Sequence, residues 1–574
     1  MNQTQLGNFW VFREGRKNVD GQSFLRQVLK TLEDISQHHV GNTSIIRALV
    51  LAGQLESALA DTDSSSPALA QSATDFLADL LVGNEQQLAR VANVSQRLAC
   101  LQVPEQLTIS PPEGFAYYAL HPSDFACMAE RVSTNSGVMA VVGIRSIGTT
   151  LSAVVSAALR HQGHSTTRIT VRPDGHPYNR VTEFNVVQRD WIHQQLDRNA
   201  HFLVADEGPG RSGSSFLSVA EALVRAGVKP ESIILMGSRA VDPSVLCAEE
   251  AATRWSQFCF LSPVVQTYER FKEDFYVGGG EWRNFFHAHL QWPESWLQME
   301  RLKFLSADRA HLFKFEGFGQ FGKDVLERAT VLSCAGFGPA AEDASDGMIC
   351  YSVIAGKRPC RSDVSGELLE QIVNYCAFRA REFACREPVS SQLGEMTRFN
   401  LQEQVGADSD FLPEALATAN PVLVDGRMQP HEWVLADQRL IKLDGTTHGD
   451  DHFFPGPTDI AWDLAGTIVE WELDRNATEF LLERFRRATG DDVRNRVRYF
   501  LLAYTIFRLG YCSMALTTVK GTPEEPRLTL ACEKYQSLAA RFANAPSHAP
   551  LPTFSMPGVE HPTLHLGQGP EINT

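Results

Sequence analysis

Residues 201–223, HFLVADEGPGRSGSSFLSVAEAL, hold the pattern on which the fold assignment depends. The apolar run FLVA ends in two acids, Asp206 and Glu207. A loop rich in Gly and Ser follows, and an amphipathic run with helical spacing comes after it. A strand, a glycine-rich loop and a helix in this order are typical of a parallel sheet, in which ligands bind at the carboxyl ends of the strands.

Strand-like runs alternate with helical runs on both sides of this stretch, at residues 138–144, 151–163, 165–171, 215–228 and 231–238. Alternation at this spacing predicts a doubly wound parallel α/β sheet over roughly residues 126–245. We place this sheet in a domain of residues 126–260.

The sequence beyond this domain has a different character. Residues 1–125 read as mostly helical and hold no catalytic pattern, so packing or dimerisation is their expected role. Residues 290–545 mix strands and helices, as in an α+β fold. Residues 546–574 are rich in Pro and Gly and nearly uncharged, which predicts an extended or disordered tail. The sequence thus predicts a multidomain protein of α/β and α+β character.

Composition restricts the function classes. The 574 residues carry a formal net charge of −16, which argues against a general nucleic-acid or anionic-membrane binder. The 11 cysteines form no CxxC pair, as expected for reduced thiols rather than a disulfide framework or a zinc site. No stretch approaches the roughly 18 apolar residues of a membrane span, and the first residues lack a signal-peptide core. We expect a soluble cytoplasmic protein that binds neither nucleic acid nor membrane.

The loop after the two acids has the chemistry of a phosphate cradle. Its glycines allow turns that aim backbone N–H groups inward, its serines add hydroxyl donors, and the next helix adds its positive end. The residues concerned are Gly208, Gly210, Ser212, Gly213, Ser214 and Ser215. Two acids beside a phosphate would repel it, but they suit a metal ion or the vicinal hydroxyls of a ribose. A sugar 5-phosphate therefore fits better than a nucleoside triphosphate.

The motif VADEGPGRSGSS resembles that of the type I phosphoribosyltransferases. The resemblance implies that Asp206 and Glu207 bind the ribose hydroxyls of phosphoribosyl pyrophosphate, and that the Gly/Ser loop binds its 5-phosphate. Two departures stand out, because Glu replaces the usual second Asp and the loop is about one residue longer. Enzymes of this type commonly form dimers, so the resemblance also implies a homodimer.

Two further segments fit the same resemblance. VVGIRSIGTT is similar to the family's pyrophosphate-binding loop, which implies that Arg145, Ser146 and Gly148 face the pyrophosphate. TVRPDGHPYNR occupies the place of the mobile loop over the site. Charge builds up on the leaving pyrophosphate, and the residues expected to neutralise it are Arg172, His176 and Arg180.

The second half resembles another family. Residues 312–339 followed by 347–359 are similar to the N-terminal lobe of aminoglycoside phosphotransferase-like kinases, which are two-lobed. In that family a strand Lys holds the ATP phosphates and a helix Glu orients the Lys. Lys314 and Glu327 match these two positions.

The stretch DGRMQPHEWVLADQRLIKLDG, residues 425–445, resembles the catalytic loop and metal-binding segment of the same kinases. Alignment on the proline places Asp425-Gly426-Arg427 on the family's His-Gly-Asp, with Asp463 on its buried Asp. Arg427 then stands where the catalytic base is expected, and Arg cannot accept a proton. Glu432 and Asp444 fall on the two metal-ligand positions and would hold Mg²⁺, a hard cation that prefers oxygen ligands.

A rival alignment uses HGDDHFFPG, with Asp450 as the base. Only nine residues separate Asp450 from Asp459, too few for the strand pair that should lie between them, so we prefer the first alignment. THGDDH, residues 447–452, then becomes an inserted loop. This loop either supplies a substitute base or metal ligand, or it is a polar surface turn.

Two hypotheses about function follow. The first is a phosphoribosyl pyrophosphate- and Mg²⁺-dependent transferase acting on a small, nucleobase-like acceptor, fused to a kinase-like domain that binds ATP. The second is a non-catalytic, nucleotide-sensing protein with a pseudokinase half, acting through a partner in a stress or defence system. A weaker third hypothesis makes the helical N-terminal region the functional part.

Overall fold

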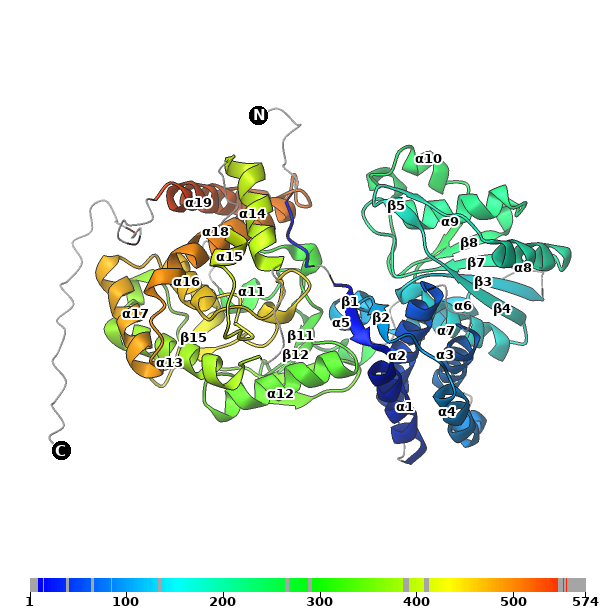
Figure 1. The fold of residues 1–574 in the computed structure, drawn as a ribbon, viewed down its shortest axis with the longest axis horizontal. Helices are drawn as coiled ribbons and strands as arrows, with labels where there is room; N and C mark the ends of the chain where they lie inside the picture. The colour runs from blue at the N-terminus through cyan, green and yellow to red at the C-terminus, as the bar shows by residue number, and fades with distance from the viewer. Residues whose placement is uncertain are drawn as a thin grey trace.

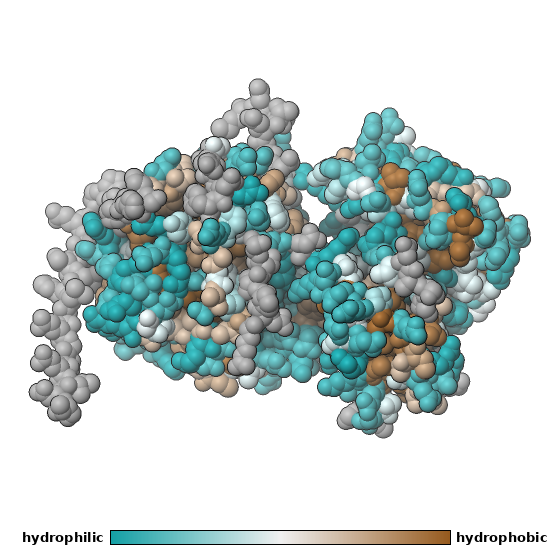
Figure 2. All heavy atoms as spheres, in the orientation of Figure 1, coloured by the Kyte–Doolittle hydropathy of each residue, from teal (hydrophilic) through white to brown (hydrophobic). Residues whose placement is uncertain are grey.

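The computed structural model describes residues 9–13, 15–37, 41–62, 67–83, 85–132, 137–263, 268–287, 292–385, 392–406, 412–545, 551 and 554. It has two bodies, one of roughly residues 15–263 and the other of residues 268–545 together with 9–13 (Figure 1). The space-filling view shows the same two masses with a hollow between them (Figure 2). The predicted tail lies outside the described residues except for Leu551 and Phe554.

The N-terminal region is mostly helical, as predicted, with one small antiparallel strand pair, β1 with β2. Its elements are β1 (Lys17–Asp20), α1 (Gly21–Gln37), α2 (Asn42–Ala60), α3 (Pro67–Leu81), α4 (Val91–Ala99), β2 (Gln106–Ile109), α5 (Glu113–Tyr117) and α6 (Pro122–Glu130). The apolar sides of these helices pack into one core with the neighbouring sheet.

A five-stranded parallel sheet follows, in the order β4-β3-β7-β8-β9. Its elements are β3 (Val138–Ile144), α7 (Ile147–His161), β4 (Ser165–Val171), α8 (Val186–Asp197), β7 (His201–Ala205), α9 (Ser214–Arg225), β8 (Ile233–Met236), α10 (Ala251–Trp255) and β9 (Cys259–Leu261). A small hairpin, β5 (Asp174–His176) with β6 (Asn179–Val181), follows β4.

Helices cover both faces of this sheet. Successive side chains of a strand point to opposite faces, and in β3 Met139 and Val141 pack with α7 and the helical region. Ala140 and Val142 pack on the other side, in the core that contains residues of α8 and α9. Since β3 and β7 are parallel neighbours, their carboxyl ends bring residues 145–146 and 206–213 to one edge.

The second body opens with a five-stranded antiparallel sheet, in the order β10-β11-β12-β14-β13. Its elements are β10 (Phe275–Tyr276), α11 (Arg283–Phe286), β11 (Lys303–Leu305), β12 (His311–Phe315), α12 (Gln320–Cys334), β13 (Ala341–Asp343) and β14 (Met348–Ser352). β10 pairs with β11, so the predicted boundary at residue 290 is wrong. A strand of two residues is too short to leave a pattern in the sequence.

The remaining elements form a mainly helical lobe with one hairpin, β15 with β16. They are α13 (Gly366–Glu382), α14 (Gln392–Val405), α15 (Leu412–Ala415), β15 (Trp433–Ala436), β16 (Arg439–Lys442), α16 (Ala461–Glu470), α17 (Arg475–Thr489), α18 (Arg494–Leu516) and α19 (Glu525–Ala543). α18 is long and apolar enough to cross a membrane, but 83% of its most apolar 18-residue window is buried inside the protein. The whole is a mixed α/β protein with a mainly helical N-terminal region.

The N-terminal segment 9–13 belongs to the core of this second body, far from β1 in packing although adjacent in sequence. Val11 is 1% exposed there. The backbone N–H of Trp10 donates to Asn400 Oδ1 at 2.7 Å, and Asn400 Nδ2 donates to the carbonyl of Trp10 at 2.7 Å. Residues 9–13 therefore pack in the second body, whereas the chain that follows them, from residue 15, belongs to the first body.

Candidate functional site

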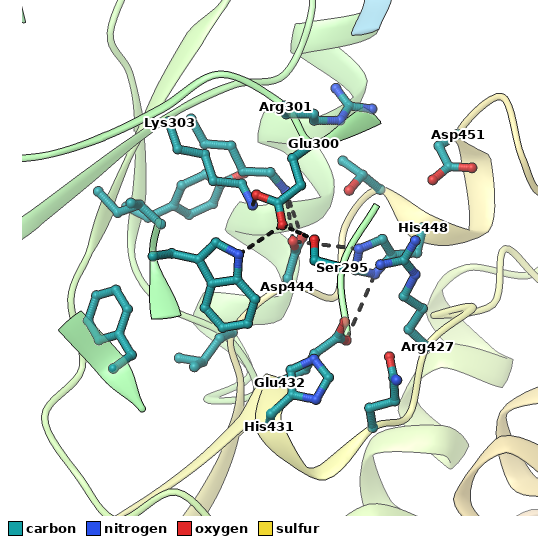
Figure 3. Close-up of a pocket in the computed structure, with 18 of the residues that line it drawn as sticks. Ser295, Glu300, Arg301, Lys303, Arg427, His431, Glu432, Asp444, His448 and Asp451 are labelled. Carbon is teal, nitrogen blue, oxygen red and sulfur yellow. Dashed lines mark hydrogen bonds and ion pairs between the residues drawn. The ribbon is translucent and has the colours of Figure 1, made fainter. Parts of the chain in front are cut away.

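A cavity of about 210 Å³ lies between the antiparallel sheet and the helical lobe. Figure 3 shows side chains from both sides converging on it. Its charged lining includes Glu294, Glu300, Arg301, Lys303, Lys314, Arg358, Arg427, Glu432, Asp444, Asp451 and Arg508. Cations slightly outnumber carboxylates in this lining, which suits an anionic ligand such as a polyphosphate.

Lys314 on β12 reaches across the cavity to Asp444. Its Nζ lies 2.8 and 3.0 Å from the two carboxylate oxygens of Asp444 and 3.1 Å from Glu316 Oε1. Burial alone would lower the pKa of Lys314, but the charges of Asp444 and Glu316 outweigh it and the pKa is raised. Burial likewise opposes ionisation of Asp444, but the Lys314 ammonium holds the pKa of Asp444 well below its usual range. Both groups are charged at neutral pH.

The prediction that Glu327 orients Lys314 is wrong. Glu327 is exposed on α12, and its partner is Lys323 at 3.7 Å. Glu316 takes the role instead, because residues two apart in an extended chain point to the same side. Arg301 adds a second cation to Glu316 at 3.3 Å. The spacing Lys-x-Glu could have indicated this pair in the sequence.

Asp463 on α16 holds the loop that carries residues 425–427. Its carboxylate accepts the backbone N–H of Asp425 at 2.8 Å and of Gly426 at 3.1 Å. Gly426 has φ of 88°, a conformation that favours glycine. The hairpin β15–β16 follows directly, as the first alignment expects. Asp450, the base of the rival alignment, instead pairs with Arg13 and Arg328 at 3.2 and 3.5 Å.

Arg427 occupies the position at which the family resemblance expects the base. Its guanidinium carbon lies 4.9 Å from the centroid of the Tyr511 ring, inside the cavity. Burial opposes its charge, but Tyr511 and Glu432 outweigh burial and the pKa of Arg427 is raised. This residue carries a fixed positive charge and accepts no proton.

The inserted loop 447–452 enters the cavity, so His448 is not part of a polar surface turn. His448 Nε2 lies 3.6 Å from Asp444 Oδ2, and Nδ1 lies 3.9 Å from Glu432 Oε2 (Figure 3). Nδ1 is buried and has no hydrogen-bond partner among the described residues. Burial holds the pKa of His448 well below its ordinary value despite Asp444, so the imidazole is neutral. A neutral ring nitrogen is a proton acceptor or a metal ligand.

The two predicted metal ligands, Asp444 and Glu432, differ in whether their carboxylates are free to bind a metal ion from the cavity. The carboxylate of Asp444 faces the cavity and suits Mg²⁺. Glu432 Oε2, by contrast, is held by Lys442 Nζ at 2.5 Å, and Asp425 Oδ1 lies 3.1 Å from the same ammonium. Asp425, Glu432 and His448 nevertheless offer ligand atoms within 4.8 Å of one another. Burial raises the pKa of Glu432 to about 7, although Lys442 and Arg427 act in the opposite sense.

The second candidate site lies at the carboxyl edge of the parallel sheet. Asp206 and Glu207 directly follow β7, and the side chain of Asp206 accepts the backbone N–H of Glu207 at 2.8 Å. Burial raises the pKa of Asp206 to about 7 and that of Glu207 to about 8. Gly114 of the helical region packs so closely on Glu207 that a Cβ there would lie 2.8 Å from its carboxyl carbon.

The Gly/Ser loop opens α9, and Gly213 at its start has φ of 68°. The hydroxyls of Ser212 and Ser214 lie 2.9 Å apart and donate to the carbonyl of Pro177 at 2.8 and 2.6 Å. Gly210 is exposed, and Ser215 lies partly buried in the first turn of the helix. The predicted mobile loop is thereby tied to the predicted phosphate cradle.

Arg145 and Arg172, both predicted to face pyrophosphate, converge on one carboxylate. Arg145 Nε lies 3.0 Å from Asp61 Oδ1, and Arg172 Nη2 lies 2.5 Å from Asp61 Oδ2. Asp61 caps the end of α2, so the helical region reaches this edge, which no sequence signal indicated. Gly148 brings the first turn of α7 against β7, since a Cβ there would lie 2.4 Å from the carbonyl oxygen of Ala205.

The other residues predicted to face pyrophosphate, Ser146, His176 and Arg180, do not converge on Asp61 as Arg145 and Arg172 do. Ser146 directly precedes α7. Arg180 donates to the carbonyl of Gly175 at 2.7 Å, and the His176 ring lies 5.5 Å from that of Tyr178. The contacts of His176 and Arg180 thus lie within their own hairpin.

No protein-family model and no curated protein matches the chain. Solved structures do. The chain is similar to choline kinase LicA from Streptococcus pneumoniae, with 12% identity over 41% of this chain and 90% of that chain, at a TM-score of 0.31. It is similar to macrolide 2′-phosphotransferase MphH from Brachybacterium faecium, with 15% identity over 43% and 89% and a TM-score of 0.27.

A third similar structure is the GDP complex of aminoglycoside 2′-phosphotransferase-IIIa, with 13% identity over 41% and 89% and a TM-score of 0.29. The likeness is to phosphotransferases of kinase-like fold. It concerns about two fifths of this chain and does not show a phosphoribosyltransferase-like domain. At such TM-scores the function has to be argued from the geometry.

Proposed function

We propose that the cleft of the C-terminal half binds a nucleoside triphosphate and transfers a phosphoryl group to a small molecule. The pair of Lys314 and Asp444, 2.8 Å apart across the cavity, carries this proposal. A lysine and an aspartate facing each other can separate to hold the phosphates and a metal-bound phosphate oxygen, respectively. Mg²⁺ on Asp444 would supply charge neutralisation of the phosphates.

The cations around this pair support a phosphate ligand. Lys303, Arg301 and Arg427 line the same cavity. Their fixed positive charges would stabilise charge that develops on a transferred phosphoryl group. Since Arg427 takes no proton, the neutral imidazole of His448 is the group beside Asp444 that would accept one from a hydroxyl substrate.

Nucleotide binding tests this proposal directly. Calorimetry with ATP and with GTP, each with Mg²⁺, should show binding, and Lys314→Ala should weaken it by about 10- to 100-fold because one charge-assisted contact is lost. Lys323→Ala, an exposed lysine of α12, is the control and should bind as the wild type does. If neither nucleotide binds at millimolar concentration, or if both variants bind equally, the proposal fails.

Turnover separates catalysis from sensing. A phosphotransferase releases nucleoside diphosphate when the acceptor is present, whereas the sensing alternative, acting through a partner, binds nucleotide without turnover. Release of diphosphate by the wild type but not by Asp444→Asn would favour catalysis, since this substitution removes the charge that the metal needs while it keeps the shape.

The edge of the parallel sheet supports a second candidate function, transfer from phosphoribosyl pyrophosphate to a small nucleobase-like acceptor. The observation behind it is that two acids after β7, a Gly/Ser loop opening α9, and the converging Arg145 and Arg172 lie at one edge. Acids bind ribose hydroxyls, the loop binds a 5-phosphate and the arginines bind pyrophosphate.

Donor binding and pyrophosphate release test this second function. Asp206→Asn combined with Glu207→Gln should abolish donor-dependent release of pyrophosphate. Glu221→Gln, which affects the pair that Glu221 forms with Arg254 on α9 and α10, is the control in the same domain. Unchanged release in the Asp206/Glu207 variant would rule the function out. Sedimentation of the same protein checks the proposed homodimer.

A further inference from the structure

Lys442 is a fully buried lysine that lies among acids, next to Glu432 and Asp444 of the cleft lining. It is the last residue of β16, two positions before Asp444, and its side chain is 0% exposed. A buried ammonium is costly unless it is paired and all of its hydrogen-bond donors are used. The contacts of Lys442 therefore determine what this part of the cleft can do.

Each of the three ammonium donors has an acceptor. Lys442 Nζ lies 2.5 Å from Glu432 Oε2, 3.1 Å from Asp425 Oδ1 and 3.1 Å from the backbone oxygen of Asp444. An ammonium group has three donors and no acceptor, so this set satisfies it completely. Oxygen ligands around one positive centre are also what a divalent cation requires.

The ammonium thus occupies the place of a metal ion. Asp425, Glu432 and His448 present ligand atoms within 4.8 Å of one another, a spacing that would suit a metal. Two of these ligands already bind Lys442 Nζ. Kinases hold two Mg²⁺ ions, one on the Asp that follows the strand pair and one on the catalytic-loop residue that corresponds to Glu432. Of these two positions, Asp444 offers a carboxylate that lines the cavity and is held by Lys314 rather than by Lys442.

We propose that Lys442 acts as a built-in cation at the second metal position, so that the cleft binds a single divalent ion, at Asp444. Lys442 is a positioning residue, because it holds Glu432 and the backbone of Asp444 rather than a substrate. The inference rests on the proposed nucleotide-binding function for the ion at Asp444, but the replacement of a metal by Lys442 is independent of it.

Counting bound Mn²⁺ tests this inference. Free Mn²⁺ is measured by electron paramagnetic resonance while the full chain is titrated, with and without a saturating non-hydrolysable ATP analogue. The wild type with nucleotide should bind one Mn²⁺. Lys442→Met keeps the side-chain volume but frees Glu432 and Asp425, and should bind one ion more than the wild type, both with and without nucleotide.

Two further variants complete the test. Lys442→Met combined with Glu432→Gln removes the ligand again and should return the count to that of the wild type. Lys323→Met, the same change at an exposed lysine, should leave it unaltered. Two Mn²⁺ ions in the wild type, or an unchanged count in folded Lys442→Met, would overturn the inference.

If Lys442→Met does not fold, Glu432→Gln alone decides. It should leave the wild-type count unchanged, because Glu432 holds Lys442 and not a metal, whereas loss of an ion would overturn the inference. Absence of nucleotide binding would refute the proposed function instead, and the titration without nucleotide would still count the ions at the second position.

Discussion

Asp206 and Glu207, at the carboxyl edge of the parallel sheet, have unusually high pKa values for carboxyl groups. Burial raises their pKa values to about 7 and about 8, and Glu113 adds to the effect on Glu207. Because these folded-state values exceed those of the unfolded chain, the folded protein binds more protons between about pH 4 and 8. The associated stability is fully present below that window and is lost as the pH rises through it.

Glu207→Gln should therefore flatten the pH dependence of stability. The glutamine has no charge to bury, so the loss of unfolding free energy between pH 5 and pH 8.5 should be smaller than in the wild type by about 1–3 kcal/mol. Urea unfolding at several pH values measures it. Glu231→Gln, the same change at an exposed residue, serves as the control and should leave the wild-type slope intact. A variant whose slope equals the wild-type slope would show that Glu207 is ionised throughout.

At the residue scale, the sequence predicted the candidate site residues that follow apolar runs. It did not predict the residues with which they form ion pairs. Asp206, Lys314 and Asp444 stand at or near strand ends, where a periodic pattern marks them. The expected partner of Lys314 was Glu327 on α12, whereas the observed partner is Glu316, which the Lys-x-Glu spacing could have indicated. Glu327 would have needed that helix to turn a different face to the strand.

Among the elements, the connection between β10 and β11 differs most from a simple hairpin. Its described parts, 277–287 and 292–302, cross from the sheet to the helical lobe. Arg283 Nη1 lies 2.9 Å from Glu524 Oε2, with both side chains under 5% exposed. Glu294 Oε1 accepts from Arg508 at 2.8 Å. The connection therefore holds the two lobes together across the candidate cleft.

Glu524→Ala should loosen this connection strongly. It leaves Arg283 buried without its partner, which costs about 3–5 kcal/mol of stability. Glu327→Ala removes the acid of an exposed pair and should cost at most about 0.5 kcal/mol. Denaturant unfolding of both variants, with proteolysis mapped to residues 277–302, gives the comparison. Equal effects in the two variants would mean that the buried pair contributes no more than the surface one.

Long periodic elements were predictable, and this connection was not. The alternation of strands and helices over residues 138–236 predicted the parallel sheet, because β3, β4, α7 and α9 are long enough to show their periods. β10, α11 and β11 have two to four residues each, and their places depend on contacts with α18 and α19. Such elements are set by tertiary packing.

At the scale of the whole molecule, the two candidate sites are connected through helix α5 and the residue that follows it. Tyr117 lines the cleft, and its neighbour Tyr118 places its hydroxyl 2.8 Å from His452 Nε2. Gly114, on the same helix α5, packs against Glu207. Arg13 donates to Tyr117 at 3.2 Å and pairs with Asp450 at 3.2 Å. One short helix with its next residue therefore contacts both sites.

Asn400→Ala should detach the N-terminal segment from the second body. It removes both hydrogen bonds to Trp10, at about 1 kcal/mol each, and so should cost about 2 kcal/mol. Proteolysis should then cut before residue 17 faster than in the wild type. Asn476→Ala, at an exposed position of α17, should not change the rate. Equal cleavage of the two variants would mean that the Trp10 contacts do not hold the segment.

The N-terminal segment also sets the order in which the chain can complete itself during synthesis. Trp10 bonds to a residue that follows it by 390 positions, and Val11 packs on Gly510 of α18. Residues 10 and 11 thus cannot dock until residues 400 and 510 have been translated. The helical and parallel-sheet body can fold earlier, but the core of the other body stays incomplete until the segment 9–13 packs into it.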